Sequence, residues 1–186
     1  TVNIVAFLIA ILSQLTGREM PFTTIQLLWI NIIMDGPPAF VLGLEPVREH
    51  VLNRKPVDRN TCIITKQMIV TIILNALYIT GVILVVQNYN ILGASAEQMT
   101  TVLFSVFAFS VLFNGFNSRE FGIDSIIPNF MKNTLAIKVI AITGIAQILC
   151  VEFFRGFFNS VHLDIILWIK ILVLAFGVIV VNEAVK

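Results

Sequence analysis

Six long runs of apolar residues place the strongest constraint on how this chain can fold. A helix needs about 20 apolar residues to cross the ~30 Å hydrocarbon core of a bilayer, and most of the runs are close to that length. The sequence therefore predicts an all-α fold, a polytopic transmembrane helical bundle. Its six membrane segments are expected at about residues 1–16, 24–44, 67–89, 99–116, 135–154 and 165–183.

The first run is shorter than the others. Residues 2–16 rise only about 22 Å at ~1.5 Å per residue, which is less than the thickness of the hydrocarbon core. We therefore expect the first helix to begin before Thr1, and the chain of residues 1–186 to be a fragment of a longer protein.

The composition agrees with a membrane location. Hydrophobic residues make up 58% of the chain and charged residues only 12%, and the mean hydropathy is +0.94. These values lie outside the range of soluble domains, so we expect an integral, multi-pass protein of the cell membrane or an internal membrane, surrounded by the lipid bilayer. No basic patch interleaved with aromatic residues occurs, which argues against a nucleic-acid partner.

Basic residues are distributed unevenly among the loops. Residues 45–66 contain five of them, and the loop after the fourth run contributes Arg119 and Lys132, whereas each connection on the other side contains at most one. Cytosolic loops of membrane proteins carry an excess of Lys and Arg. The sequence therefore predicts that these two loops, and both ends of the chain, face the cytosol.

The second run contains an acid near its middle. Asp35 lies within the stretch "NIIMDGPPA" at residues 31–39, where an ionisable side chain costs about 2.5–3.5 kcal/mol on insertion scales and is tolerated mainly for function. Asn31 precedes it by four residues, which is one turn of an α-helix. Two hard oxygen donors are thus predicted to point the same way.

Two prolines follow this carboxylate. Pro37 and Pro38 lack N–H groups, so the carbonyls of Ile33 and Met34 lose their partners in an α-helix, and Gly36 supplies the freedom to unwind. Carboxylate, amide and carbonyl oxygens together suit a hard cation such as Ca²⁺. The alternative is a proline-kinked helix whose acid is protonated or paired with a base elsewhere.

The same stretch carries a family resemblance. Residues 28–39, "LWINIIMDGPPA", and 42–46, "LGLEP", resemble the sixth membrane helix of calcium-transporting P-type ATPases. Residues 31–39 are especially similar to the secretory-pathway subfamily, whereas residues 1–3 and 112–119 look more like the fifth and eighth helices of the plasma-membrane type. The resemblance implies that residues 1–186 are the carboxy-terminal membrane domain, helices five to ten, of such a pump.

The resemblance also implies which residues meet the transported ion. Asn31 and Asp35 match ligands of Ca²⁺, and Asn3 matches an asparagine that lies at or near the ion site. The carbonyls freed by the prolines, together with a helix that precedes this chain in the family, would complete the oxygen shell of the ion.

Three positions depart from related pumps. Ala6 and Val111 stand where two-site pumps of the endoplasmic reticulum have glutamates, which implies one ion per cycle. Phe40 stands where the secretory-pathway subfamily has a glutamine associated with manganese handling. The resemblance therefore favours a single calcium site and leaves the choice between calcium and manganese open.

The residues needed for ATP chemistry do not occur in these 186 residues. There is neither an Asp-Lys-Thr-Gly-Thr phosphorylation motif nor a P-loop, so the chain alone is not expected to hydrolyse ATP. By resemblance, ATP and Mg²⁺ bind to upstream phosphorylation and nucleotide domains of the same pump, which exports Ca²⁺ from the cytosol. Two alternatives remain open: a secondary cation/proton transporter or channel, and a structural membrane anchor.

Other polar residues are expected to have ordinary roles. Glu152 and Arg155 are expected to pair at a membrane interface, and Lys170 to extend its ammonium group to that interface. His162 has no partner at metal-ligand spacing, so no metal site is expected there.

Overall fold

The computed structural model describes residues 1–44, 64–119 and 133–185, and within these ranges it contains helices and no strand. This confirms the predicted all-α fold. The helices are α1 (Val2–Leu15), α2 (Thr24–Trp29), the π-helix η1 (Ile30–Asp35), α3 (Gly36–Leu42), α5 (Lys66–Tyr89), α6 (Met99–Asn117), α7 (Thr134–Phe153), α8 (Arg155–Phe158) and α9 (Ile165–Val185).

Five helical stretches in the described residues are long and apolar enough to cross a membrane. They are α5, α6, α7, α9 and the continuous stretch Thr24–Leu42, which joins α2, η1 and α3. Their limits agree with the predicted segments to within a few residues. The sixth predicted segment is also an apolar helix, α1, but its 14 residues make it shorter than the other five.

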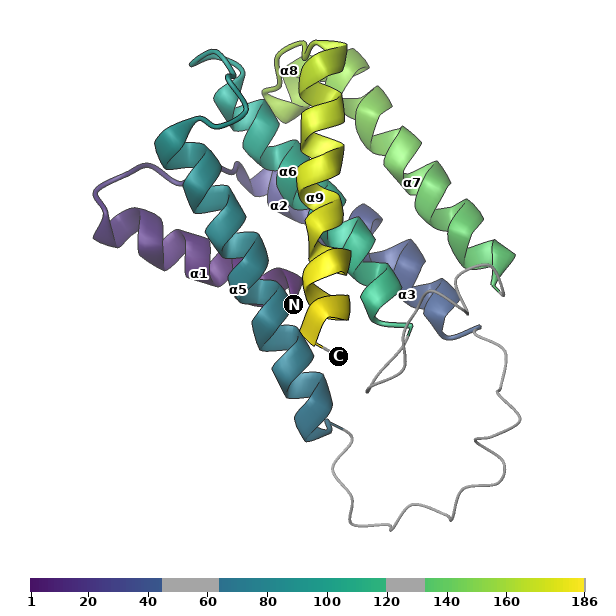
Figure 1. The fold of residues 1–186 in the computed structure, drawn as a ribbon. Coiled ribbons are helices and arrows are strands. Elements are labelled where there is room, and N and C mark those ends of the chain that lie inside the picture. Colours follow the sequence, from purple (N-terminus) through teal and green to yellow (C-terminus); the bar gives the residue numbers. More distant parts are fainter. Residues whose placement is uncertain (45–63, 120–132, 186) are drawn as a thin grey trace, which may run out of the picture.

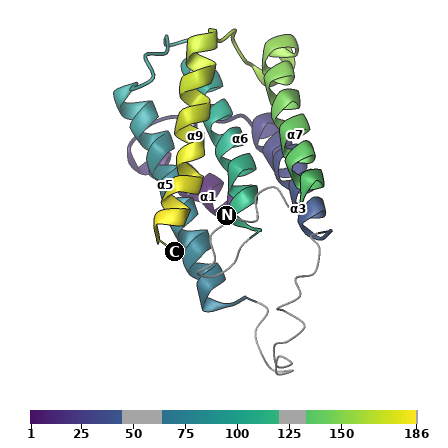
Figure 2. The same ribbon diagram turned by 45° about the vertical axis from the view of Figure 1, so that its right-hand side comes forward.

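The long helices run side by side, and their connections alternate between two ends of the bundle (Figures 1 and 2). At one end α3 and α6 finish and α5 and α7 begin; we call it the basic end, after the basic loops of the sequence. The carboxy-terminal end of α9 lies there too. The other, short-loop end carries residues 90–98 and the short helix α8. The basic end is the one predicted to face the cytosol.

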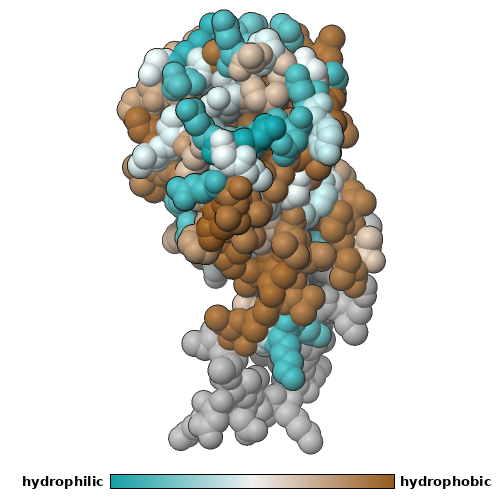
Figure 3. Space-filling model, turned by 90° about the vertical axis from the view of Figure 1, so that its left-hand side faces the viewer, coloured by the Kyte–Doolittle hydropathy of each residue, from teal (hydrophilic) through white to brown (hydrophobic). Residues whose placement is uncertain are grey.

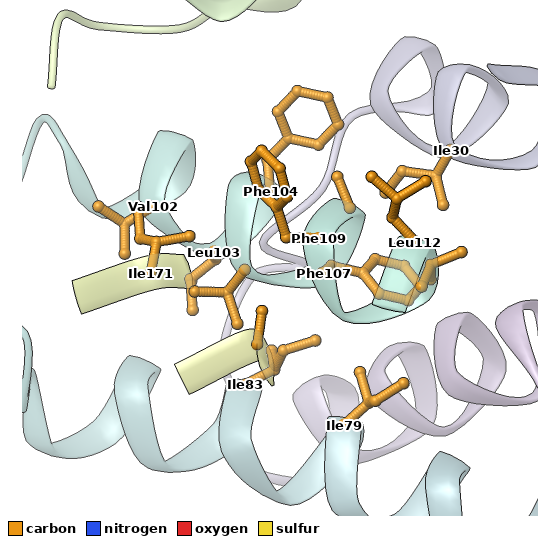
Figure 4. Close-up of a cluster of buried hydrophobic side chains, with 14 of the residues drawn as sticks. Ile30, Ile79, Ile83, Val102, Leu103, Phe104, Phe107, Phe109, Leu112 and Ile171 are labelled. Carbon is orange, nitrogen blue, oxygen red and sulfur yellow. The ribbon is translucent and has the colours of Figure 1, made fainter. Parts of the chain in front are cut away.

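Helix α6 forms the centre of the bundle. Of the 18 residues in its most apolar stretch, 78% are buried, whereas 28% to 39% are buried in the corresponding stretches of the other four spans. It packs against α5, α7, α9 and η1. Figure 4 shows its side chains meeting those of the surrounding helices, and the labelled core residues are Ile30, Ile79, Ile83, Val102, Leu103, Phe104, Phe107, Phe109, Leu112 and Ile171.

The outward faces of the surrounding helices are apolar. Leu77 on α5, Ile142 on α7 and Val173 on α9 are each at least 60% exposed. Figure 3 shows a hydrophobic band below a cap of hydrophilic residues on one side of the bundle. Burying such surface in lipid removes it from water, so these faces are the expected boundary with the hydrocarbon core.

Candidate cation site

The membrane segment that carries Asp35 begins with a well-formed helix cap. The Thr23 hydroxyl accepts a hydrogen bond from the backbone N–H of Gln26 at 3.3 Å, and the Gln26 side chain accepts one from the backbone N–H of Thr23 at 3.0 Å. This reciprocal pair satisfies two N–H groups that the first turn of a helix leaves without partners. Gln26 is fully buried and also donates to the carbonyl of Phe158 at 2.8 Å. The start of the segment is therefore fixed to the short-loop end.

The helix changes register before the prolines. Residues Ile30–Asp35 form a π-helix, and a new α-helix, α3, begins at Gly36 with Pro37 and Pro38 in its first turn. A proline fits the first turn of a helix because its missing N–H would have no partner there. Short π-helical turns inside α-helices are often found at functional sites.

This geometry differs from the unwinding that the sequence led us to expect. Gly36 has φ −60° and ψ −63°, which are right-handed helical values that other residues adopt as well. The chain stays helical through this turn although two N–H donors are missing. Apart from its chain neighbours and the backbone of its own helix, no atom lies within 4 Å of the position that a Cβ at Gly36 would take, so this glycine borders open space.

The π turn also changes which carbonyls lack a donor. An α-helical carbonyl accepts from the residue four positions later and a π-helical one from the residue five positions later. For Ile33 these are Pro37 and Pro38, and neither has an N–H group. For Met34 they are Pro38 and Ala39, so Met34 has no donor in the α register, in which α3 begins at Gly36. Ile33 therefore lacks both kinds of partner, and Met34 lacks the α-helical one.

The two polar side chains of this stretch remain open to their surroundings. The Asp35 side chain is exposed and has no ion pair or hydrogen bond with any other described residue. The Nδ2 atom of Asn31 donates to the carbonyl of Leu27 at 3.0 Å, which leaves its amide oxygen as a free acceptor. Because a π turn is wider than an α turn, the two residues are no longer one full turn apart, as the sequence argument had assumed.

The other side of the segment is firmly packed. Ile30 and Met34 are fully buried in the core, against α6. Pro38 is buried too, and a Cβ placed on Gly115 of α6 would lie 3.6 Å from its Cβ atom, an ordinary contact distance. The indole Nε1 of Trp29 donates to Oε1 of Gln147 on α7 at 2.7 Å. The segment therefore has one anchored face and one open face, and the open face includes Asp35.

The remaining candidate residues occupy different environments. Asn3 lies exposed in the first turn of α1, a helix that contacts η1. Ala6 is half-buried against the core and Val111 is only 4% exposed, so both place apolar groups inside the bundle. Phe40 is 71% exposed. No group of three or more His, Cys, Asp or Glu side chains in the described ranges is close enough to hold a metal ion.

Sequence reasoning missed a second polar cluster at the short-loop end. The Glu152 carboxylate accepts hydrogen bonds from Arg155 at 3.1 Å, from the Trp168 indole at 3.1 Å and from the Leu163 backbone N–H at 3.3 Å. The Nδ1 atom of His162 lies 2.6 Å from the same carboxylate. The pairing of Glu152 with Arg155 was expected. The other contacts were not, because nothing in the sequence indicates how residues 159–164 fold back on α7.

Comparison with known proteins decides the family. Residues 19–186 match the family described as "Cation transporting ATPase, C-terminus". The chain belongs to this family. It is 35% identical to "Calcium-transporting ATPase 12, plasma membrane-type" of Arabidopsis thaliana over 88% of its own length, and 32% identical to "Calcium-transporting ATPase 1, plasma membrane-type" of Oryza sativa subsp. japonica over 97%. It spans 16% and 18% of these relatives, respectively.

The family confirms the resemblance seen in the sequence. A match over residues 19–186 includes every described helix except α1. Together with the five apolar spans, membership identifies this member of the cation-transporting ATPase family as an integral, multi-pass membrane protein. The relatives named above are of the plasma-membrane type, whereas residues 31–39 by themselves had looked closer to the secretory-pathway subfamily.

Proposed function

We propose that this chain is the membrane part of an ATP-driven pump that exports Ca²⁺ from the cytosol. The observation that carries the proposal is the open face of η1, where Asp35 has no counter-charge among the described residues and Ile33 has a carbonyl without an α- or π-type donor. An unpaired acid in a membrane segment is expensive, and a bound cation would offset that cost. The names of the relatives, which are calcium-transporting ATPases, support Ca²⁺ as the ion.

The donors offered are the kind that Ca²⁺ prefers. Ca²⁺ takes six to eight oxygens in flexible geometry, whereas zinc and copper prefer imidazole and thiolate. Asp35, the amide oxygen of Asn31 and the carbonyl of Ile33 supply fewer oxygens than a full shell needs. Asn3 is the further donor proposed from α1. The rest of the shell would come from a segment that covers the open face, and ATP and Mg²⁺ would act on upstream domains of the same pump.

A single ion per cycle follows from the apolar residues at two positions. Neither Ala6 nor Val111 offers an oxygen from its side chain, and Val111 is buried among the core residues of α6. The amount of Ca²⁺ bound per phosphorylated pump tests this directly. A ratio near one agrees with a single site, and a ratio near two contradicts it.

Transport by an Asp35→Asn variant of the whole pump tests the function. ATP-dependent uptake of Ca²⁺ into inside-out vesicles should collapse, because the amide keeps the shape of the side chain and removes its charge. Glu97→Gln is the matched control, since it removes one carboxylate from an exposed loop of the short-loop end and should leave uptake unchanged.

Three results would contradict the proposal. Uptake that continues without ATP, driven by a proton gradient, would indicate a secondary transporter, and uptake down the Ca²⁺ gradient would indicate a channel. Full uptake by Asp35→Asn would leave the chain with the role of a structural anchor. Loss of uptake in both variants would show that removal of any acid disturbs the protein, and would remove the special role of Asp35.

A further inference from the structure

An apolar groove lies on the outside of the bundle between α5 and α9. One part of it has a volume of about 420 Å³ and is lined by Tyr78, Leu92, Lys170 and their neighbours. A second hollow of about 320 Å³ shares Tyr78 with the first and runs beside it along α5, from Tyr78 past Gly81 to Val85, toward the short-loop end. We call the two hollows together the α5–α9 groove. Figures 1 and 2 show α5 and α9 diverging toward the short-loop end, where the groove lies.

Two glycines give the groove its shape. A Cβ on Gly177 would overlap the hydroxyl oxygen of Tyr78, so the glycine lets Tyr78 lie against α9 and donate to the carbonyl of Leu174 at 3.1 Å. That contact holds the two helices together at the level of Tyr78. At Gly81 no atom lies within 4 Å of a would-be Cβ, so the wall of the groove is open there.

One cation stands at the upper end of the groove. Lys170 is five residues into α9, about 8 Å from the start of the helix at 1.5 Å per residue, and its side chain tilts back toward that start. Its Nζ atom donates to the carbonyl of Leu92 at 2.7 Å. No carboxylate in the described part of the chain pairs with it. An ammonium group has three donors, so two remain for another acceptor at the depth of the lipid headgroups.

The groove opens onto the surface that faces the bilayer, because Leu77 and Val173 beside it are 60% and 69% exposed. A molecule complementary to it carries a negative group at the depth of Lys170 and a thin apolar chain below. An apolar partner helix fits less well, since it would leave the two remaining donors of Lys170 without an acceptor. We infer that the α5–α9 groove binds one phospholipid of the bilayer, with its phosphate on Lys170 and one acyl chain running from the level of Val85 inward to Tyr78.

Photo-crosslinking to a lipid tests this site without any measurement of transport. The full-length protein is placed in bilayer discs of phosphatidylcholine with a trace of phosphatidylcholine whose acyl chain carries a photoactivatable group, and crosslinked peptides are mapped. Crosslinks should concentrate on peptides of α5 and α9. Lys170→Met should lower their yield roughly tenfold, as expected for the loss of one hydrogen bond between charged groups, while Lys170→Arg should retain it.

Two more variants separate the groove from lipid contact in general. Gly81→Leu fills the open wall with a side chain that favours helices, so it should fold and still lower the yield. Lys138→Met removes an exposed cation from the first turns of α7 and should leave the yield unchanged. Equal yields from the wild type and Lys170→Met would overturn the inference. Equal labelling of the groove and of the exposed face of α7 would also overturn it. A third such result would be crosslinks, in native membranes, that join the groove to another protein.

Discussion

Replacing Gly177 by alanine should loosen the contact between α5 and α9. The new methyl group would overlap the hydroxyl of Tyr78 and would lie 3.1 Å from its Cζ atom, so the tyrosine ring has to move. Moving it breaks the hydrogen bond from the hydroxyl to the carbonyl of Leu174. The lost bond and the crowding of one extra methyl group together should lower the free energy of unfolding by about 2–4 kcal/mol.

A second substitution shows whether this reasoning is right. Tyr78→Phe removes the hydroxyl and should by itself cost about 1 kcal/mol, the usual value of such a bond in a membrane. In that background Gly177→Ala should cost clearly less than it does alone, because only the contact with Cζ remains tight. The assay is unfolding of the purified full-length protein by increasing fractions of a denaturing detergent, followed by circular dichroism.

The matched control is Gly81→Ala on α5. This glycine has open space around its Cβ position, so alanine should leave stability unchanged or raise it by up to about 1 kcal/mol through its higher helix propensity. Two outcomes would refute the reasoning. In one, Gly177→Ala unfolds at the same detergent fraction as the wild type. In the other, it costs as much without the tyrosine hydroxyl as with it.

Two further predictions concern the cation site and the short-loop end. Replacing Pro37 and Pro38 together by alanine returns N–H donors to the carbonyl of Ile33, so the Ca²⁺ concentration for half-maximal uptake should rise about tenfold, as expected for about 1.4 kcal/mol of lost affinity. The control Pro21→Ala changes a proline in a loop and should leave this concentration unchanged. An unchanged concentration in the double variant would contradict the role of Ile33. Glu152→Ala leaves the Trp168 indole and the Leu163 N–H without their acceptor, and should lower the free energy of unfolding by about 1–3 kcal/mol in the same detergent titration. Glu97→Ala, which alters an exposed loop, should stay within about 0.5 kcal/mol of the wild type, and an equal loss in both variants would contradict the clustering around Glu152.

The sequence predicted the helices well because their signal is local. Apolar stretches of about 20 residues are visible without any knowledge of packing. The limits of α5, predicted at 67–89 and found at Lys66–Tyr89, illustrate this agreement. The short helix α8 was missed, because its four residues carry no hydropathy signal of their own.

Details of the candidate site depended on information that hydropathy does not contain. The two prolines indicated that donors would be missing near Asp35, but they did not distinguish unwinding from a π turn, since both relieve the same loss. The anchors of the segment join residues far apart in the chain: Gln26 reaches Phe158 and Trp29 reaches Gln147. A buried glutamine in an apolar helix signals that a partner exists, but the sequence does not say which residue it is.

The anchoring of the segment limits how a site on η1 could release its ion. Gln26 and Trp29 fix one side of the π turn to α8 and α7, and Pro38 packs against α6 on the other side. The carbonyl of Ile33 is therefore held between two fixed points. A transporter must bind its ion with different affinity in two states, and that difference requires some ligand to move. On the proposed function, the ligands that move would belong to the segment proposed to cover the open face of Asp35, and η1 itself would stay in place.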